Sequence, residues 1–454
     1  MLRASLDASC IEGVGAEVVT ACAGGAIWTA WALQLGMSPV VTGVLGALPY
    51  LAQFVQFPAA WMTSRLGHRR AALWAVTLSR QVLWPLVALP FLPLGPGAQR
   101  AVLLSVAALA AVLGVLGNNA WVAWMGELVP SRLRGRFFGR RTALYTASTS
   151  LGALGAGLVL DRARAHGHGA VALGGLALLA CLAGLFCRSM MQRQGDPSPH
   201  GSAVHVDLEA ALRPVKDPSA RRVLAFQTTW NAAIGVSATF FTLYMLQTLK
   251  MGFATIALYN AGLAVVRILA LPLWGRALDR LGVRPVLVAC SFGIGIIPII
   301  WLFTRPDFFW PILFLDMVLS GVFWGGHGLG SFALPLAVAP KKGRPFYLAA
   351  FATAGGAAYA LASVSGGFLV EHLPVWTGRS TLFGFQGLFV ISALLRFSAG
   401  FLALRLREDR ARPLSELIHL VRYGAAARLR TGLPSLGARQ PRVARRVDAR
   451  RASR

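Results

Sequence analysis

Apolar residues fill most of this chain in long unbroken runs, and short polar segments separate one run from the next. Twelve of these runs are long enough for a helix to cross a bilayer, which takes about 20 predominantly apolar residues. The runs cover residues 12–34, 39–63, 71–92, 101–126, 140–160, 169–187, 222–247, 253–274, 286–304, 308–336, 346–370 and 382–404. Because they are continuous, they exclude a β-barrel, whose strands alternate apolar and polar residues. The pattern predicts an all-α polytopic membrane protein with twelve transmembrane helices.

The composition supports this prediction. Hydrophobic residues make up 56% of the 454 residues and charged residues only 13%, which is too little polar surface to cover a soluble fold of this size. The 49 glycines suit helices that approach one another closely in a membrane. The first run follows a single early cation, Arg3, without a small-residue cleavage pattern. We therefore expect a retained helix rather than a removed signal peptide.

Lysine and arginine concentrate in every second gap between the runs. Arg65, Arg69 and Arg70 follow the second run, whereas the odd-numbered gaps hold few cations, such as Arg100 and Lys250. Because Lys and Arg stay on the cytoplasmic side of membrane proteins, we expect the even-numbered gaps and both termini in the cytoplasm, and the protein in the cell membrane. The arginine-rich tail is expected to lie against anionic lipid. The net charge of +27 therefore does not predict a nucleic-acid partner, since no folded reading surface accompanies the tail.

The two halves of the chain repeat the same landmarks in the same order. Ser64-Arg65-Leu66-Gly67 matches Asp279-Arg280-Leu281-Gly282 at an offset of 215 residues. At an offset of 210 residues, Pro130 and Arg134 match Pro340 and Arg344. At the same offset, Gly157 and Asp161 match Gly367 and Glu371. Parallel halves around a central cavity are typical of transporters. We expect an N-terminal six-helix bundle over 1–187, a cytoplasmic linker over 188–221, a C-terminal six-helix bundle over 222–405 and a basic cytoplasmic tail over 406–454.

Two loop segments carry a family resemblance. The segment from Gly275 to Arg284 resembles the G-x-x-x-D-R-x-G-x-R loop signature of the major facilitator superfamily. The segment from Glu127 to Gly135 is similar to the E-x-x-P-x-x-x-R-G element that follows the fourth helix of that family. The resemblance implies two six-helix bundles that rock around a site near the membrane midplane. It also implies secondary transport, driven by an ion gradient or by the gradient of the solute itself.

The resemblance further assigns a set of residues to a cytoplasmic gate. These are Ser64, Arg65, Gly67, Arg69, Glu127, Arg134, Gly275, Asp279, Arg280, Gly282, Arg284 and Arg344. The first-half loop departs from the signature, because Ala60 replaces its glycine and Ser64 its aspartate. In the family this aspartate braces the gate at a helix N-terminus, where a negative charge is favoured. We therefore expect Asp279 to brace the gate more strongly than Ser64.

Polar residues at membrane depth are the candidates for the solute cavity or for coupling, because they are costly there. They are Glu17, Arg80, Asn118, Asn119, Trp121, Gln227, Trp230, Asn231, Asp316 and His327. Glu17 and Asp316 are the candidate proton carriers and the candidate partners of Arg80, while Glu12 is expected at the interface. The asparagines and tryptophans suit a solute with hydroxyl groups or rings. The alternatives are inter-helix hydrogen bonds, an interfacial aromatic belt and structural ion pairs.

In the tenth run, Asp316, Ser320, Phe323 and His327 fall on one helical stripe. Eleven residues separate Asp316 from His327, which is about 16 Å along a helix, so these two side chains are not expected to touch. We expect each of them to line the cavity. The alternative for His327 is a hydrogen bond to a backbone carbonyl where glycine-rich helices cross.

The predicted function is secondary active transport of a small organic solute by alternating access, coupled to protons or another ion. We expect no cofactor, no metal, a monomer, and membrane lipid as the other partner. The chain has no G-x-x-x-x-G-K loop for ATP, and His166 and His168 lack a third metal ligand. The alternatives are a sensor or scaffold that has the same fold but carries no solute, and a membrane-embedded enzyme. The sequence shows no nucleophile close to a base that would support the enzyme. The identity of the solute and the direction of transport stay open.

Overall fold

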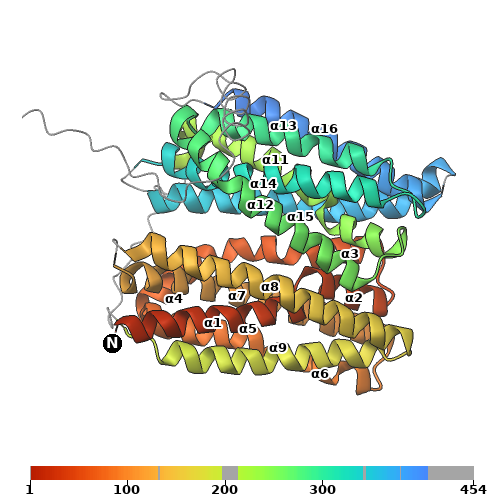
Figure 1. Cartoon of the computed structure of the whole chain (residues 1–454), viewed down its shortest axis with the longest axis horizontal. Helices are drawn as coiled ribbons and strands as arrows, with labels where there is room; N and C mark the ends of the chain where they lie inside the picture. Colours follow the sequence, from red (N-terminus) through yellow and green to blue (C-terminus); the bar gives the residue numbers. More distant parts are fainter. Residues whose placement is uncertain (1, 131–132, 197–212, 341–343, 379, 407–454) are drawn as a thin grey trace, which may run out of the picture.

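The structure is a computed structural model that describes residues 2–130, 133–196, 213–340, 344–378 and 380–406, and all its regular elements in these residues are helices (Figure 1). In the first half they are α1 (Leu2–Ala23), α2 (Gly25–Gln34), α3 (Pro39–Leu51), η1 (Ala52–Val55), α4 (Gln56–Leu66), α5 (His68–Gln81), α6 (Trp84–Ala88), η2 (Leu89–Phe91), α7 (Pro96–Leu128), α8 (Arg134–Ala165) and α9 (Gly169–Gln192). In the second half they are α11 (Pro218–Gln247), α12 (Phe253–Leu281), α13 (Val283–Trp301), α14 (Trp310–Val338), α15 (Arg344–Thr377) and α16 (Thr381–Leu404).

The all-α polytopic fold is confirmed, and ten of the expected spans in the described residues have the length and hydropathy of a membrane helix. The second expected span does not: its apolar helix covers only Pro39–Val55, and the separate helix α4 follows it. The seventh expected span lies in α11, which is long enough at 30 residues. Polar residues such as Gln227 and Asn231 lower the hydropathy of α11.

The first three spans are interrupted near their middle, whereas the corresponding helices α11, α12 and α13 run continuously. Gly24 separates α1 from α2 and takes an extended conformation, with φ −98° and ψ −171°. The third span breaks between α5 and α6, just before Pro85. Interrupted helices are tolerated at membrane depth where they line a cavity or are buried in protein. The duplicated halves therefore differ in their backbone near the middle of the bundle.

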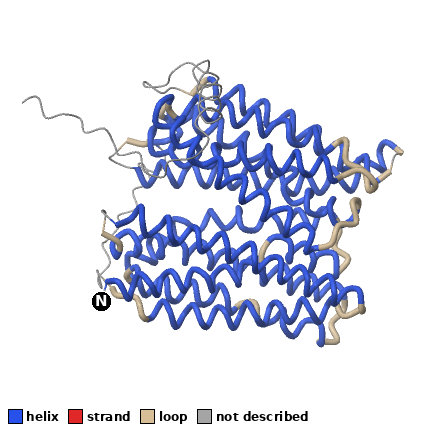
Figure 2. The backbone as a smooth tube through the Cα atoms, in the orientation of Figure 1, coloured by secondary structure: helices blue, strands red, loops and turns tan. Residues whose placement is uncertain are grey.

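The helices form two groups, the first half at the bottom and the second half at the top of Figure 1. We call the end where α1 begins and α9 ends the N-terminal end, and the opposite end, where α8 ends and α12 begins, the distal end. Across the halves, α3 packs against α15 and α8 against α12. Figure 2 shows the two groups in contact toward the distal end and apart toward the N-terminal end. Residues 197–212 of the expected linker and 407–454 of the expected tail lie outside the described residues, and the domain boundaries stay predictions.

Each half has its own apolar core. In the second half, Trp301, Tyr244 and Phe389 are at most 2% exposed and pack edge to face around one another. In the first half, Trp31 and Leu103 belong to a separate buried cluster. Dispersion contacts of this kind hold membrane helices together, since lipid removes most of the hydrophobic driving force between them.

Candidate functional site

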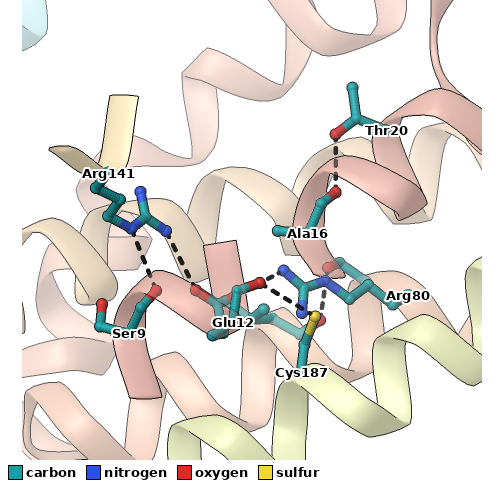
Figure 3. A network of polar contacts seen from close by, with 9 residues as sticks. Ser9, Glu12, Ala16, Thr20, Arg80, Arg141 and Cys187 are labelled. Atoms are coloured by element: carbon teal, nitrogen blue, oxygen red, sulfur yellow. Dashed lines mark hydrogen bonds and ion pairs between the residues drawn. The ribbon is translucent and has the colours of Figure 1, made fainter. Parts of the chain in front are cut away.

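One carboxylate in the first half binds two arginines. Glu12, on α1, is 3% exposed, and its Oε1 accepts a hydrogen bond from Arg80 Nη2 on α5 at 3.1 Å (Figure 3). Its Oε2 accepts one from Arg141 Nη2 on α8 at 3.2 Å. Figure 3 shows the two guanidinium groups approaching Glu12 from opposite sides. Because both carboxylate oxygens are paired, the burial of this charge is compensated by two ionic hydrogen bonds.

Further contacts hold the second arginine in place. Arg141 donates from Nε to the backbone oxygen of Ser9 at 3.4 Å, and its guanidinium lies 4.3 Å from the centre of the Trp121 ring. When Glu12 is ionised, two cations face one anion, so this network keeps an excess positive charge. Within the described part of the chain, Arg80 Nη1 and Trp121 Nε1 are buried without a hydrogen-bond partner. The network can therefore accept an additional acceptor group.

One expectation about this region was wrong: Arg80 pairs with Glu12 rather than with Glu17 or Asp316. Glu12 is buried between helices, and its expected position at the membrane interface stays a prediction. The periodicity of α1 alone does not tell which of its two carboxylates faces α5. Arg141 was not among the residues singled out from the sequence. The signal for Arg141 was its position at the start of an apolar run.

Glu17 has a different environment from Glu12. Its side chain is 2% exposed, and the hydroxyl of Thr149 on α8 donates a hydrogen bond to its Oε2. This partner is neutral, so protonation of Glu17 would break no ion pair with Thr149. Near the α1–α2 break, a cavity of about 310 Å³ is lined mainly by residues of α1, α2, α3, α5 and α7, including Thr20, Trp28 and Arg80. The first half thus contains a fixed ion network and, one to two helical turns away, a carboxylate held by a hydroxyl group.

In the second half, Asp316 on α14 is the acceptor of a buried hydrogen-bond network. It is 2% exposed and accepts from Trp301 Nε1 at 2.8 Å and from Ser320 Oγ at 2.5 Å. The hydroxyl of Tyr259 on α12 donates a third hydrogen bond to it. All three donors are neutral. Like Glu17, Asp316 can therefore gain or lose a proton without breaking a direct ion pair with any of these three donors.

A cavity of about 230 Å³ adjoins this carboxylate. Its polar lining consists of Thr242, Tyr259, Asn260, Asp316, Ser320 and Arg396, with the indole rings of Trp301 and Trp324 beside them. Arg396 on α16 is 2% exposed and donates to the Ile294 backbone oxygen and to Ser237 Oγ, both at 3.2 Å. A carboxylate and a guanidinium therefore face one cavity. Arg396, Tyr259 and Asn260 were not among the cavity residues predicted from the sequence, although a lone asparagine within an apolar run was a usable signal.

The stripe predicted on α14 divides into two environments. Asp316 and Ser320 line this cavity, and His327 lies outside its lining. The imidazole of His327 stacks on Trp230 of α11, with ring centres 4.0 Å apart, and it shares a hydrogen bond with Ser331 Oγ at 3.1 Å. It bonds a side chain of its own helix rather than the backbone carbonyl considered above.

The predicted amides are less clearly placed. Asn231 donates from Nδ2 to the Gln227 backbone oxygen of its own helix at 2.8 Å. On α7, Asn118 is exposed and Asn119 half-buried. Their assignment to a solute cavity stays a prediction, as does that of the other candidate residues.

The structure places most of the predicted gate residues at the N-terminal end. Glu127 pairs with His68 Nδ1 at 3.1 Å, and Arg69 Nη2 donates to the Gln192 backbone oxygen at 2.8 Å. Gly67 and Gly282 have φ of 80° and 94°, so the duplicated glycine ends one helix and begins the next in a conformation that side chains disfavour. Asp279 and Arg280 are exposed, and Gly275 has open space around it. The side chains of Ser64, Arg134 and Arg344 lie outside the described residues. The gate assignment stays a prediction.

Comparisons with known proteins agree with this fold. Residues 228–441 match the sequence family described as the Major Facilitator Superfamily. No curated protein sequence matches the chain significantly. Among solved structures, the nucleoside transporter NupG is similar over 89% of this chain and 98% of its own, with 13% identity and a TM-score of 0.66. The D-xylose-proton symporter is similar over 87% and 97%, with 12% identity and a TM-score of 0.63.

A bacterial metal transporter also has this fold, with 13% identity, a TM-score of 0.62, and coverage of 88% of this chain and 98% of its own. At such identities, each likeness shows the fold alone. The family match makes residues 228–441 similar in sequence to the Major Facilitator Superfamily, and the fold shared with these transporters extends over most of the chain.

Proposed function

We propose that this protein carries a small organic solute across the cell membrane by alternating access, driven by a proton gradient. The observation that carries the proposal is the asymmetric contact between the halves. They pack together through α3–α15 and α8–α12 toward the distal end, while the helices diverge toward the N-terminal end (Figure 2). A pair of bundles joined at one end only is one of the two states that alternating access requires.

The charge distribution supports an inward-facing orientation for this state. The N-terminal end carries many exposed arginines, among them Arg65, Arg70, Arg140, Arg221, Arg276 and Arg280. The distal end carries fewer exposed cations, such as Arg162, Lys250 and Arg305. Since Lys and Arg remain cytoplasmic, the N-terminal end would face the cytoplasm, with both termini inside. The solute would then exchange with the cytoplasm in this state.

The buried carboxylates support proton coupling. Glu12 is neutralised by two guanidinium groups, so a proton there would compete with two ion pairs. Glu17 and Asp316 accept hydrogen bonds from neutral hydroxyl and indole groups instead. A proton can neutralise such a carboxylate as the bundles move, and neutralisation lowers the cost of enclosing it. These two residues are therefore the proposed proton carriers, with Arg396 as the cation across the cavity from Asp316.

The cavity lining supports a solute with hydroxyl groups or rings. Asn260 and Ser320 offer hydrogen bonds, and Trp324 offers an aromatic face in the same cavity. A few polar groups on an aromatic wall are the usual composition of small-molecule sites. The remaining partners in the proposal are the coupling proton and membrane lipid, with the protein acting as a monomer and without nucleic acid.

The test is binding followed by flux. Purified protein is screened against a solute library by thermal shift, and each binder is then measured in proteoliposomes with and without an imposed pH gradient. Accumulation that depends on the gradient and is absent from empty liposomes is the expected result. Uptake that is unchanged when the gradient collapses would remove proton coupling. Binding without flux for every solute would favour a sensor or scaffold with this fold.

A further inference from the structure

At the distal end, each half contributes a carboxylate to the beginning of a helix in the other half. Asp161, on α8, accepts hydrogen bonds from the backbone nitrogens of Phe253 and Ala254, at 2.8 and 2.9 Å. Glu371, on α15, accepts one from the backbone nitrogen of Val40 at 3.3 Å. These nitrogens lie in the first turns of α12 and α3. The two acids are the residues that correspond to each other in the internal duplication.

The first of these contacts replaces a missing helix cap. Gly252 is the N-cap residue of α12 and has no side chain to accept from the first N–H groups of that helix. A Cβ atom at Gly252 would lie 2.7 Å from Asp161 Oδ2, in the space that the carboxylate occupies. The first turn of a helix has unpaired N–H groups and a partial positive charge, both of which favour a carboxylate. Asp161 therefore caps α12 from the opposite half of the molecule.

A glycine one helical turn before each acid brings the two backbones together. A Cβ atom at Gly157 would lie 2.7 Å from the Ala254 nitrogen, and one at Gly367 would lie 2.5 Å from the Pro39 backbone oxygen. No side chain larger than hydrogen fits either position without moving the helices apart. The same arrangement of glycine, three residues and an acid thus makes both contacts between the halves.

One cation reinforces the first contact. The guanidinium of Arg164 on α8 lies 4.7 Å from the ring centre of Phe253, in the same turn of α12 that Asp161 caps. Arg164 also donates to the Ala30 backbone oxygen of α2 at 3.3 Å. A residue of the first half therefore holds both a helix of its own half and the first residue of α12.

We propose that Asp161 and Glu371 are paired gate residues that hold the distal end closed. This inference rests on the proposed alternating access. When the halves separate at the distal end, both acids lose their helix partners, and water takes the place of the lost hydrogen bonds. A charged hydrogen bond of this kind contributes about 1 kcal/mol, so each contact is expected to favour the closed state about fivefold. The two contacts act in parallel, one at each side of the interface.

The test measures the width of the distal end directly. Spin labels are attached to Val171→Cys on α9 and Ser380→Cys beside α16, both exposed positions on opposite halves, while the five native cysteines are buried. Distances are read by pulsed electron resonance in lipid nanodiscs. Asp161→Asn and Glu371→Gln are each expected to reduce the closed-to-open population ratio about fivefold. The matched control is Asp307→Asn, which removes an exposed carboxylate at the same end and is expected to change nothing.

A second variant separates gating from simple helix capping. Gly252 has φ −75° and ψ 160°, which any residue can adopt, so Gly252→Asp can supply α12 with its own cap when Asp161→Ala removes the original one. The combined variant is expected to regain thermal stability while its distal end stays open. Recovery of the closed distances would overturn the proposal, and so would wild-type distances in the combined Asp161→Asn and Glu371→Gln variant. No solute or gradient is needed, so failure of transport and failure of the gate give different results.

Discussion

Arg80 and Glu12 form an ion pair inside the first half, with Nη2 and Oε1 3.1 Å apart and the two side chains 11% and 3% exposed. Arg141 completes the network from the other side of the carboxylate. We expect Glu12→Gln to destabilise the protein by about 3 kcal/mol, because two largely buried guanidinium groups lose the carboxylate that both of them contact. Thermal unfolding in detergent measures this change.

Asp7 provides the matched control for that prediction. It lies on the same helix and pairs with Arg140 at 3.6 Å, but the two side chains are 48% and 68% exposed. Exposed ion pairs contribute little, so Asp7→Asn is expected to change stability by less than about 1 kcal/mol. Equal melting temperatures for Glu12→Gln and Asp7→Asn would show that the buried network is not needed for stability.

Asp316→Asn tests the proposed proton carrier. The amide has the same size as the carboxylate but cannot carry a proton through the cycle, and its NH2 group must replace an acceptor of Tyr259 or Trp301. We expect solute uptake driven by a pH gradient to fall to the rate seen without one, while solute binding persists. Flux in proteoliposomes measures the first quantity and thermal shift the second. Asp307→Asn, at an exposed position, serves as the control, and wild-type coupling in Asp316→Asn would contradict the assignment.

Two glycines of the loop signature are expected to respond in opposite directions to alanine. Gly282 has φ 94°, so Gly282→Ala should destabilise the protein by about 1–3 kcal/mol through backbone strain. Gly275 lies inside α12 with open space around it, so Gly275→Ala should be neutral or stabilise by up to about 1 kcal/mol. Unfolding of both variants under one condition checks the pair. The same sign for both would contradict the conformational explanation.

The gate prediction concerns the opposite end of the molecule. We expect Ser64→Asp to favour closure of the N-terminal end, because a carboxylate at this loop can face a helix N-terminus, and Asp279→Asn to disfavour it. Spin labels at Gln192→Cys and Leu404→Cys, exposed positions on the two halves, report the separation of this end. The distance should shorten in the first variant and lengthen in the second. Identical distances in wild type and both variants would remove the proposed bracing role.

Much of the fold could be predicted from the chain because its signals are local or repeated. The length of an apolar run sets whether a helix can cross a bilayer, so most spans were located without a structure. Two expected spans fell short of that standard, because the apolar helix of one ends at Val55 and polar side chains lower the hydropathy of α11. The correspondence of Asp161 with Glu371 was also visible in the sequence. That both acids bind a helix of the other half was not visible there.

The partners of buried charges were decided by the tertiary structure. Glu12 and Glu17 stand five residues apart on α1, about 7.5 Å along the axis and on different faces, and only the rotation of α1 against α5 and α8 determines which one meets Arg80. The stripe of α14 divided for the same reason, because Asp316 faces α12 and α13 whereas His327 faces Trp230 of α11. A sequence determines what each helix can bury, through the free energy of moving its side chains out of water. How the helices tilt and turn against one another decides which of those side chains meet.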